Sequence, residues 1–163
     1  MAWYLVLTKP RLEETALLHL ERQGYPCYLP RLSVEKVRRG KAQVVREPMF
    51  PRYLFVQLDA SGQGQSWSPI RSTQGVSTLV RFGAEPAKVN DALVDLLRSR
   101  EQERPLQTLF QPGDAVVVTE GPFAGIEAIY QTADPQRRAM ILLEILSRPL
   151  LMKVDAGALR RLE

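Results

Sequence analysis

The feature that most constrains the fold is a polar, proline-bearing stretch in the second half of the chain. Residues 99–112 are mostly polar and include Pro105 and Pro112. Proline ends helices and central strands, so such a stretch is typical of a linker. We predict a domain over residues 1–100, a linker over 101–112 and a domain over 113–163. A second domain of about 50 residues would have a thin core and marginal stability on its own.

The two parts also differ in charge. Residues 1–100 hold 15 Lys and Arg against 9 Asp and Glu, whereas residues 101–163 hold 7 against 9. A basic first part indicates an anionic partner. Its cations gather around a predicted hairpin turn, where they either contact phosphates or form an ordinary solvated loop. These cations are Lys36, Arg38, Arg39, Lys41 and Arg46.

Composition argues against several function classes. Cys27 and His19 are the only cysteine and histidine, which excludes an internal disulfide, a multi-cysteine zinc site and most histidine-based catalysis. No phosphate-binding glycine loop or paired-carboxylate signature occurs. We therefore expect neither an enzyme nor a metal or cofactor. The sequence contains no run of about 18 apolar residues and no basic, apolar leader, so we expect a cytoplasmic protein without membrane contact.

The first part predicts an α+β domain. A strand at Arg52–Leu58 has Leu54, Val56 and Leu58 on one face and Tyr53 and Phe55 on the other. Two apolar faces mean either a sheet covered on both sides within one domain or a docking surface. The other predicted strands cover residues 2–8, 28–37, 42–46 and 76–82, and helices are predicted over 11–23 and from Asn90 onward.

The second part is ambiguous. Asp114–Thr119 and Glu127–Thr132 are predicted as strands joined by a Gly-Pro turn. Ala139–Leu146 is apolar at almost every position, so periodicity does not separate a strand from a helix. Its Ala, Met, Leu and Glu residues favour a helix, whereas the preceding turn favours a small β-barrel.

Several motifs resemble the NusG family of transcription elongation factors along nearly the whole chain. The resemblance implies an N-terminal domain with an antiparallel sheet and flanking helices, followed by a KOW-type C-terminal domain. The motifs are Trp3-Tyr4, Glu47–Val56, Thr73–Val76, Val80–Gly83 and a KOW-like segment from Pro112 to Gly125. Within the family the chain looks most like the specialised paralogue RfaH, at Leu18–Gln23, Glu35-Lys36, Arg39–Lys41 and Met140–Leu146.

The resemblance implies a binding function. Family N-terminal domains bind the clamp helices of RNA polymerase through an apolar surface. Here that surface corresponds to Pro51, Tyr53, Phe55, Val94 and Leu97. No bond is made or broken in this activity.

RfaH-like proteins also contact the exposed non-template DNA strand, which is single-stranded. The matching positions are Lys9, His19, Arg22 and Thr73. Gln74 stands where the family pattern has an arginine, and Arg71 could substitute for it. The segment Ser66–Ser68 departs from the polar triplet that faces the polymerase in RfaH.

The C-terminal domain has two implied states. In general NusG factors it is a five-stranded KOW barrel. In RfaH-like proteins it is an α-helical hairpin that covers the polymerase-binding surface, and on release it refolds to the barrel and recruits the ribosome through a small-subunit ribosomal protein. We expect the hairpin in the intact chain, held by a Glu47–Arg138 ion pair. The residues expected to cover Tyr53 and Phe55 are Leu142, Leu143, Ile145 and Leu146, and Leu146 would face the ribosomal partner in the barrel.

These features predict a monomeric, operon-specific antitermination factor that couples transcription to translation. One alternative is a general NusG-type factor with a permanent barrel. Another is a ribosomal or RNA-binding KOW protein, which its net charge of +4 disfavours.

Overall fold

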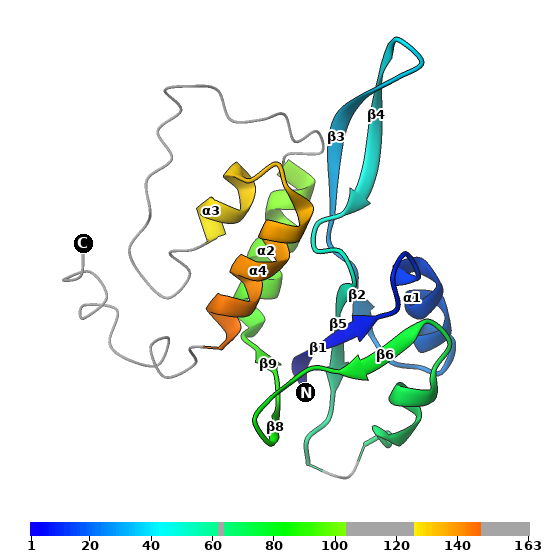
Figure 1. The fold of residues 1–163 in the computed structure, drawn as a ribbon. Coiled ribbons are helices and arrows are strands. Elements are labelled where there is room, and N and C mark those ends of the chain that lie inside the picture. Colours follow the sequence, from blue (N-terminus) through cyan, green and yellow to red (C-terminus); the bar gives the residue numbers. More distant parts are fainter. Residues whose placement is uncertain (62–63, 104–125, 148–163) are drawn as a thin grey trace, which may run out of the picture. The chain divides into compact units, whose positions relative to one another are not determined.

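The computed structural model describes residues 1–61, 64–103 and 126–147 of the chain (Figure 1). The chain divides into two compact units, Met1–Gln107 and Thr108–Glu163, and each is described by itself. None of the helices in these ranges is both long and apolar enough to cross a membrane.

The first unit is built on a five-stranded antiparallel sheet. Strand β1 (Ala2–Thr8) lies in the middle, with β5 (Tyr53–Leu58) along one edge and β2 (Cys27–Tyr28) beyond it. Strands β6 (Val76–Leu79) and β9 (Lys88–Val89) pair with the other edge of β1. The predicted strands at 2–8 and 52–58 are thus confirmed.

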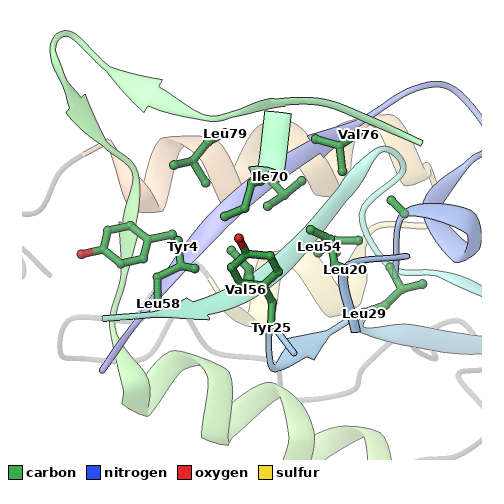
Figure 2. Packing of buried hydrophobic residues seen from close by; sticks show 12 residues of the cluster. Tyr4, Leu20, Tyr25, Leu29, Leu54, Val56, Leu58, Ile70, Val76 and Leu79 are labelled. Atoms are coloured by element: carbon green, nitrogen blue, oxygen red, sulfur yellow. The ribbon is translucent and has the colours of Figure 1, made fainter. Parts of the chain in front are cut away.

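The first face of the sheet carries the main core. Residue Leu54 pairs with Val6, and both point to this face because side chains alternate along a strand. Helix α1 (Glu13–Arg22) and the short 3₁₀ helix η1 (Ser68–Ser72) cover it. Their buried apolar side chains meet those of the strands in one cluster (Figure 2). That cluster includes Tyr4, Leu20, Tyr25, Leu29, Val56, Leu58, Ile70, Val76 and Leu79.

The second face is also buried. Here Leu5 pairs with Phe55, and the Phe55 ring stacks on Tyr28 at a centroid distance of 6.1 Å. Helix α2 (Asp91–Glu103) packs against β1, and the guanidinium of Arg98 lies 5.0 Å from the Trp3 ring and 4.9 Å from the Tyr28 ring. Cation–π contacts of this kind stabilise a half-exposed helix edge. Both faces of β5 are therefore packed.

Two hairpins lie outside the central sheet. The longer joins β3 (Arg31–Arg38) to β4 (Lys41–Pro48) and extends away from the sheet (Figure 1). The predicted turn at residues 38–41 is confirmed. The shorter joins β7 (Arg81–Phe82) to β8 (Glu85–Pro86).

The extent of helix α2 corrects the predicted start of the linker at residue 101. It continues to Glu103, so residues 101–103 are helical and not part of a linker. Glu and Gln are good helix formers, and the first proline comes only at position 105. Residues 104–125 lie outside the described part, and with them the predicted strand at Asp114–Thr119 and the KOW-like turn.

The described part of the second unit is helical. Helix α3 (Ile126–Gln131) is followed by α4 (Pro135–Leu146), and the two contact each other. The predicted strand at Glu127–Thr132 is wrong, because Ile126, Ile129 and Tyr130 are buried at the three- and four-residue spacing of a helix. Asp134 caps α4 by accepting a hydrogen bond from the Gln136 amide at 3.0 Å. The ambiguous stretch Ala139–Leu146 is therefore helical.

Candidate interaction surfaces

The predicted polymerase-binding residues do not form one exposed patch in the described chain. Phe55, Val94 and Leu97 are all 0% exposed, whereas Pro51 and Tyr53 are half-buried. Phe55 lies on the second face of the sheet, and Val94 and Leu97 are on α2. A partner could reach the buried three only after they become uncovered.

The turn before β5 holds Tyr53 in place through residues that sequence reasoning missed. Arg52 has a left-handed backbone with φ of 73°, which is unusual for a non-glycine residue. Its amide donates to Glu13 Oε2 at 2.9 Å, and its Nε donates to the Thr8 carbonyl at 3.0 Å. Glu13 is buried in the first turn of α1. These bonds compensate the strained backbone, and only a three-dimensional view reveals them.

The predicted DNA-contacting residues lie around α1 and the segment that follows η1. We call this set the α1 patch; its members are Lys9, His19, Arg22, Arg71, Thr73 and Gln74. Lys9, Arg22, Arg71 and Gln74 are exposed, and His19 is half-buried. Two backbone contacts bring the segments together: the Lys9 amide donates to the Gly75 carbonyl at 2.8 Å, and Gly75 approaches the start of α1 closely.

Thr73 differs from the rest of the α1 patch, because it is buried and its hydroxyl is already engaged. The hydroxyl donates to the Pro69 carbonyl at 2.9 Å and accepts from Gln23 Nε2 at 2.8 Å. Gln23 also donates to the His19 carbonyl at 3.0 Å. The Thr73 hydroxyl thus links the segment after η1 to Gln23 and positions the patch, and its contact with DNA stays a prediction. Gln23 belongs to the Leu18–Gln23 motif, but the motif does not reveal its partner, which is 50 residues away.

Gly75 explains why the Thr73–Val76 motif contains a glycine. Its φ is 88°, and a Cβ atom there would lie 2.8 Å from the Ala16 amide nitrogen. Real Cβ atoms do not come this close to backbone atoms, and L-residues avoid this φ. The motif therefore seats the η1–β6 connection directly on α1.

Glu101, at the end of α2, joins three strands. One carboxylate oxygen accepts from the Tyr28 hydroxyl at 2.7 Å and from the Arg31 amide at 3.4 Å. The other forms an ion pair with Arg46 of β4. Glu101 therefore fixes the base of the β3–β4 hairpin to α2. No sequence pattern indicated this residue.

The residues predicted to join the two domains have partners within their own units. Glu47 forms an ion pair with Lys36 at 2.7 Å on the hairpin. Arg138 is 1% exposed and donates to the Thr132 and Ala133 carbonyls at 2.9 and 3.2 Å, which terminates α3. An ion pair between Glu47 and Arg138 would join the two units, and it stays a prediction. On α4, Leu142 and Leu146 are buried, and Leu143 and Ile145 are half-buried.

Cys27 does not have the properties of a nucleophile. Burial raises the pKa of its thiol to about 12, and the charge of Glu21 adds to this shift. Its sulfur donates to the Tyr25 carbonyl at 3.4 Å. A thiol with this pKa stays protonated at neutral pH, and the thiolate is the reactive form.

Comparison with known proteins identifies the family. A family model described as "Transcription termination factor nusG" matches residues 1–98, more than half of the chain. The chain belongs to the NusG family. It is 29% identical over 174 residues to the transcription termination/antitermination protein NusG of Thermus thermophilus, with 94% of each chain covered. It is 30% identical over 139 residues to the protein of the same name from Deinococcus radiodurans, covering 76% of this chain and 73% of that one.

Some NusG relatives are longer than this chain. A NusG of Streptomyces virginiae is 28% identical over 176 residues, and the chain covers 58% of its length. The family match of residues 1–98 includes the aromatic second face of β5 and the whole α1 patch. It ends within α2, before Glu101 and before the second unit.

Proposed function

We propose that this NusG-family protein is a transcription elongation and antitermination factor of the RfaH-like, operon-specific kind. The names of its relatives, which are termination/antitermination proteins, support the role in transcription. One observation carries the specialised part: residues 126–146 form helices α3 and α4, where a general NusG factor would have strands of a KOW barrel. The proposal includes no catalytic step.

In this proposal the polymerase is bound through the second face of β5 and through α2. Tyr53, Phe55 and Leu97 would pack against the clamp helices, with Pro51 and Val94 at the edge. Three of these side chains are now fully buried, so binding requires that they be uncovered. A factor built this way is inactive until a signal releases it, as expected of a factor that acts on few operons.

The α1 patch would supply that signal by reading the non-template DNA strand. Its exposed cations suit phosphates, and His19 and Gln74 can hydrogen-bond to base edges. Gln74 replaces the arginine of the family pattern, so the DNA sequence read here would differ from that read by RfaH itself.

The C-terminal unit would control access to the polymerase-binding face and, after release, recruit the ribosome. Its helical form would cover the polymerase-binding face, with the Glu47–Arg138 ion pair favouring this state. After release it would refold to a barrel and bind a small-subunit ribosomal protein through Leu146. Two packings within a few kcal/mol of each other are enough for such a switch.

The test compares the intact chain with the fragment Met1–Gln107 for binding to a purified elongation complex whose DNA lacks any pause element. The fragment must extend past Glu101, since this residue anchors the β3–β4 hairpin. We expect the fragment to bind and the intact chain not to bind. Equal binding would reject autoinhibition, and failure of both would reject the polymerase assignment.

A general NusG-type factor is the second candidate. All three relatives named above match most of this chain and are called NusG, which favours it. It predicts equal binding by fragment and intact chain, and amide chemical shifts of strands over residues 126–146 in solution.

A further inference from the structure

The outer half of the β3–β4 hairpin has two faces of different chemistry. The register pairs Lys36 with Gln43 and Arg38 with Lys41, so these four side chains share one face. The opposite face carries Val37, Ala42 and Val44 together with Glu35, and the two valines are 75% and 60% exposed. The positive charges of Lys36, Arg38 and Lys41 therefore lie on one face of the ribbon, whereas the other face is mainly apolar with one carboxylate.

The cations at the turn lack counter-charges. Lys36 and Arg46 have ion-pair partners in Glu47 and Glu101. Arg38, Arg39 and Lys41 have none among the residues that the structure describes. We call these three residues the hairpin tip. Three cations within four residues that have no ion-pair partner in the described part of the chain form a site for anions.

The turn itself keeps a cation at a strained position. Arg39 and Gly40 form the two-residue loop, with φ of 53° and 76°. Positive φ at both central residues defines the type I′ turn, for which Asn-Gly is the usual choice. A non-glycine residue other than Asn or Asp in this conformation costs about 1–2 kcal/mol. Strain of this kind is found where a side chain is needed for function.

From these observations we propose that the hairpin tip binds the phosphate backbone of double-stranded DNA. Residues 33–46 contain no aromatic side chain, and proteins that hold single strands use aromatic rings for base stacking. A two-stranded β-ribbon has the width that fits the major groove of a duplex. Arginine and lysine contacts to phosphates are independent of sequence. The hairpin tip is thus a second DNA contact, separate from the α1 patch and beyond the function proposed above.

The test measures binding of the intact protein to a short labelled DNA duplex of random sequence by fluorescence anisotropy over a series of salt concentrations. The variant R38Q/K41Q removes two cations of the hairpin tip. We expect the slope of log K against log salt concentration to fall by about 1.8, since each phosphate contact contributes about 0.9. Circular dichroism verifies that the variant is folded.

A matched control removes two exposed cations elsewhere, Arg81 and Lys88. R81Q/K88Q should leave the slope unchanged, and V37T/V44T on the apolar face should do the same. An unchanged slope in R38Q/K41Q would overturn the proposal, as would an equal fall in R81Q/K88Q, which would indicate only net charge. A loss limited to single-stranded DNA or to duplex RNA would also overturn it. None of these outcomes depends on binding to the polymerase.

Discussion

The α1 patch and the hairpin tip are both basic, but they are built differently. In the α1 patch, Gln23 holds Thr73 by a hydrogen bond of 2.8 Å, and Gly75 lies directly against α1. At the hairpin tip, the cations project from a two-stranded ribbon that Glu101 anchors at its base. A rigid surface can discriminate between bases, because it holds its donors in fixed directions. Projecting, unpaired cations are sufficient for contacts with phosphates.

The largest effect on stability is expected from Gly75→Ala, which would disrupt the rigid α1 patch. An alanine at this position would have an unfavourable backbone φ, and its methyl group would clash with the backbone of Ala16. We expect a loss of about 2–4 kcal/mol in the free energy of unfolding, measured by urea denaturation.

Gly83→Ala is the control for this substitution. Gly83 has φ of 66° but nothing within 4 Å of an added Cβ atom. It isolates the backbone strain, for which we expect about 1 kcal/mol. Equal losses in both variants would mean that the contact of Gly75 with α1 contributes nothing.

The next effect tests the base of the hairpin. Glu101→Gln removes the charge that binds Tyr28, Arg31 and Arg46. Hydrogen bonds to a charged, largely buried carboxylate are stronger than neutral ones, so we expect a loss of about 1–2 kcal/mol in the free energy of unfolding. Amide hydrogen exchange should increase in β3 and β4 more than in β1.

Glu14→Gln provides the comparison for Glu101→Gln. Glu14 also forms an ion pair, with Arg31 at 2.6 Å, but its side chain is 65% exposed. Such pairs contribute about 0.5 kcal/mol or less. If the two variants lose equal stability, the assignment of Glu101 as the anchor of the hairpin is wrong.

A smaller effect is expected from Gln23→Ala. It leaves the Thr73 hydroxyl with the Pro69 carbonyl alone and should cost about 1 kcal/mol in stability. Because Thr73 positions the α1 patch, binding to single-stranded DNA should weaken while duplex binding by the hairpin tip is retained. Gln43→Ala, at an exposed hairpin position, should change stability by less than about 0.5 kcal/mol. Retained single-strand binding in Gln23→Ala would show that Thr73 has no positioning role.

The smallest effect has the opposite sign. Arg39→Asn relieves the left-handed backbone of the turn and should stabilise the protein by about 0.5 kcal/mol in thermal unfolding. The same variant should weaken duplex DNA binding, because a cation is lost. Arg38→Asn, one residue earlier in β3, should weaken binding without any gain in stability. A gain in both stability and binding for Arg39→Asn would contradict the role of the hairpin tip.

The sequence predicts the central sheet well because its strands have strong local patterns. Ala2–Thr8 and Tyr53–Leu58 are rich in large and β-branched apolar residues, and both are strands. The prediction of a strand at Glu127–Thr132 is wrong, because a short apolar run fits either period and the preceding Gly-Pro turn favours a hairpin. Tertiary context decides such cases.

Residues that act through distant partners are invisible to sequence patterns. The exposed cations of the α1 patch follow from motif positions, and the structure brings them to one side of α1. Glu101 lies in no motif, and the role of Gln23 does not follow from its motif, because each binds residues about 50–70 positions away. Thr73 was found by resemblance, but only its hydrogen bonds reveal that it is a buried support.

The central position of β1 has a consequence for biosynthesis. Strand β1 is synthesised before the three strands that pair with it, β5, β6 and β9, and β9 ends at Val89. At about 5–20 residues per second, the ribosome needs several seconds to deliver these partners. Until then the apolar side chains of Trp3–Val6 have no strand to pair with. The nascent chain thus carries an apolar strand before its partners have been synthesised, and we expect chaperones to bind it there until the sheet closes.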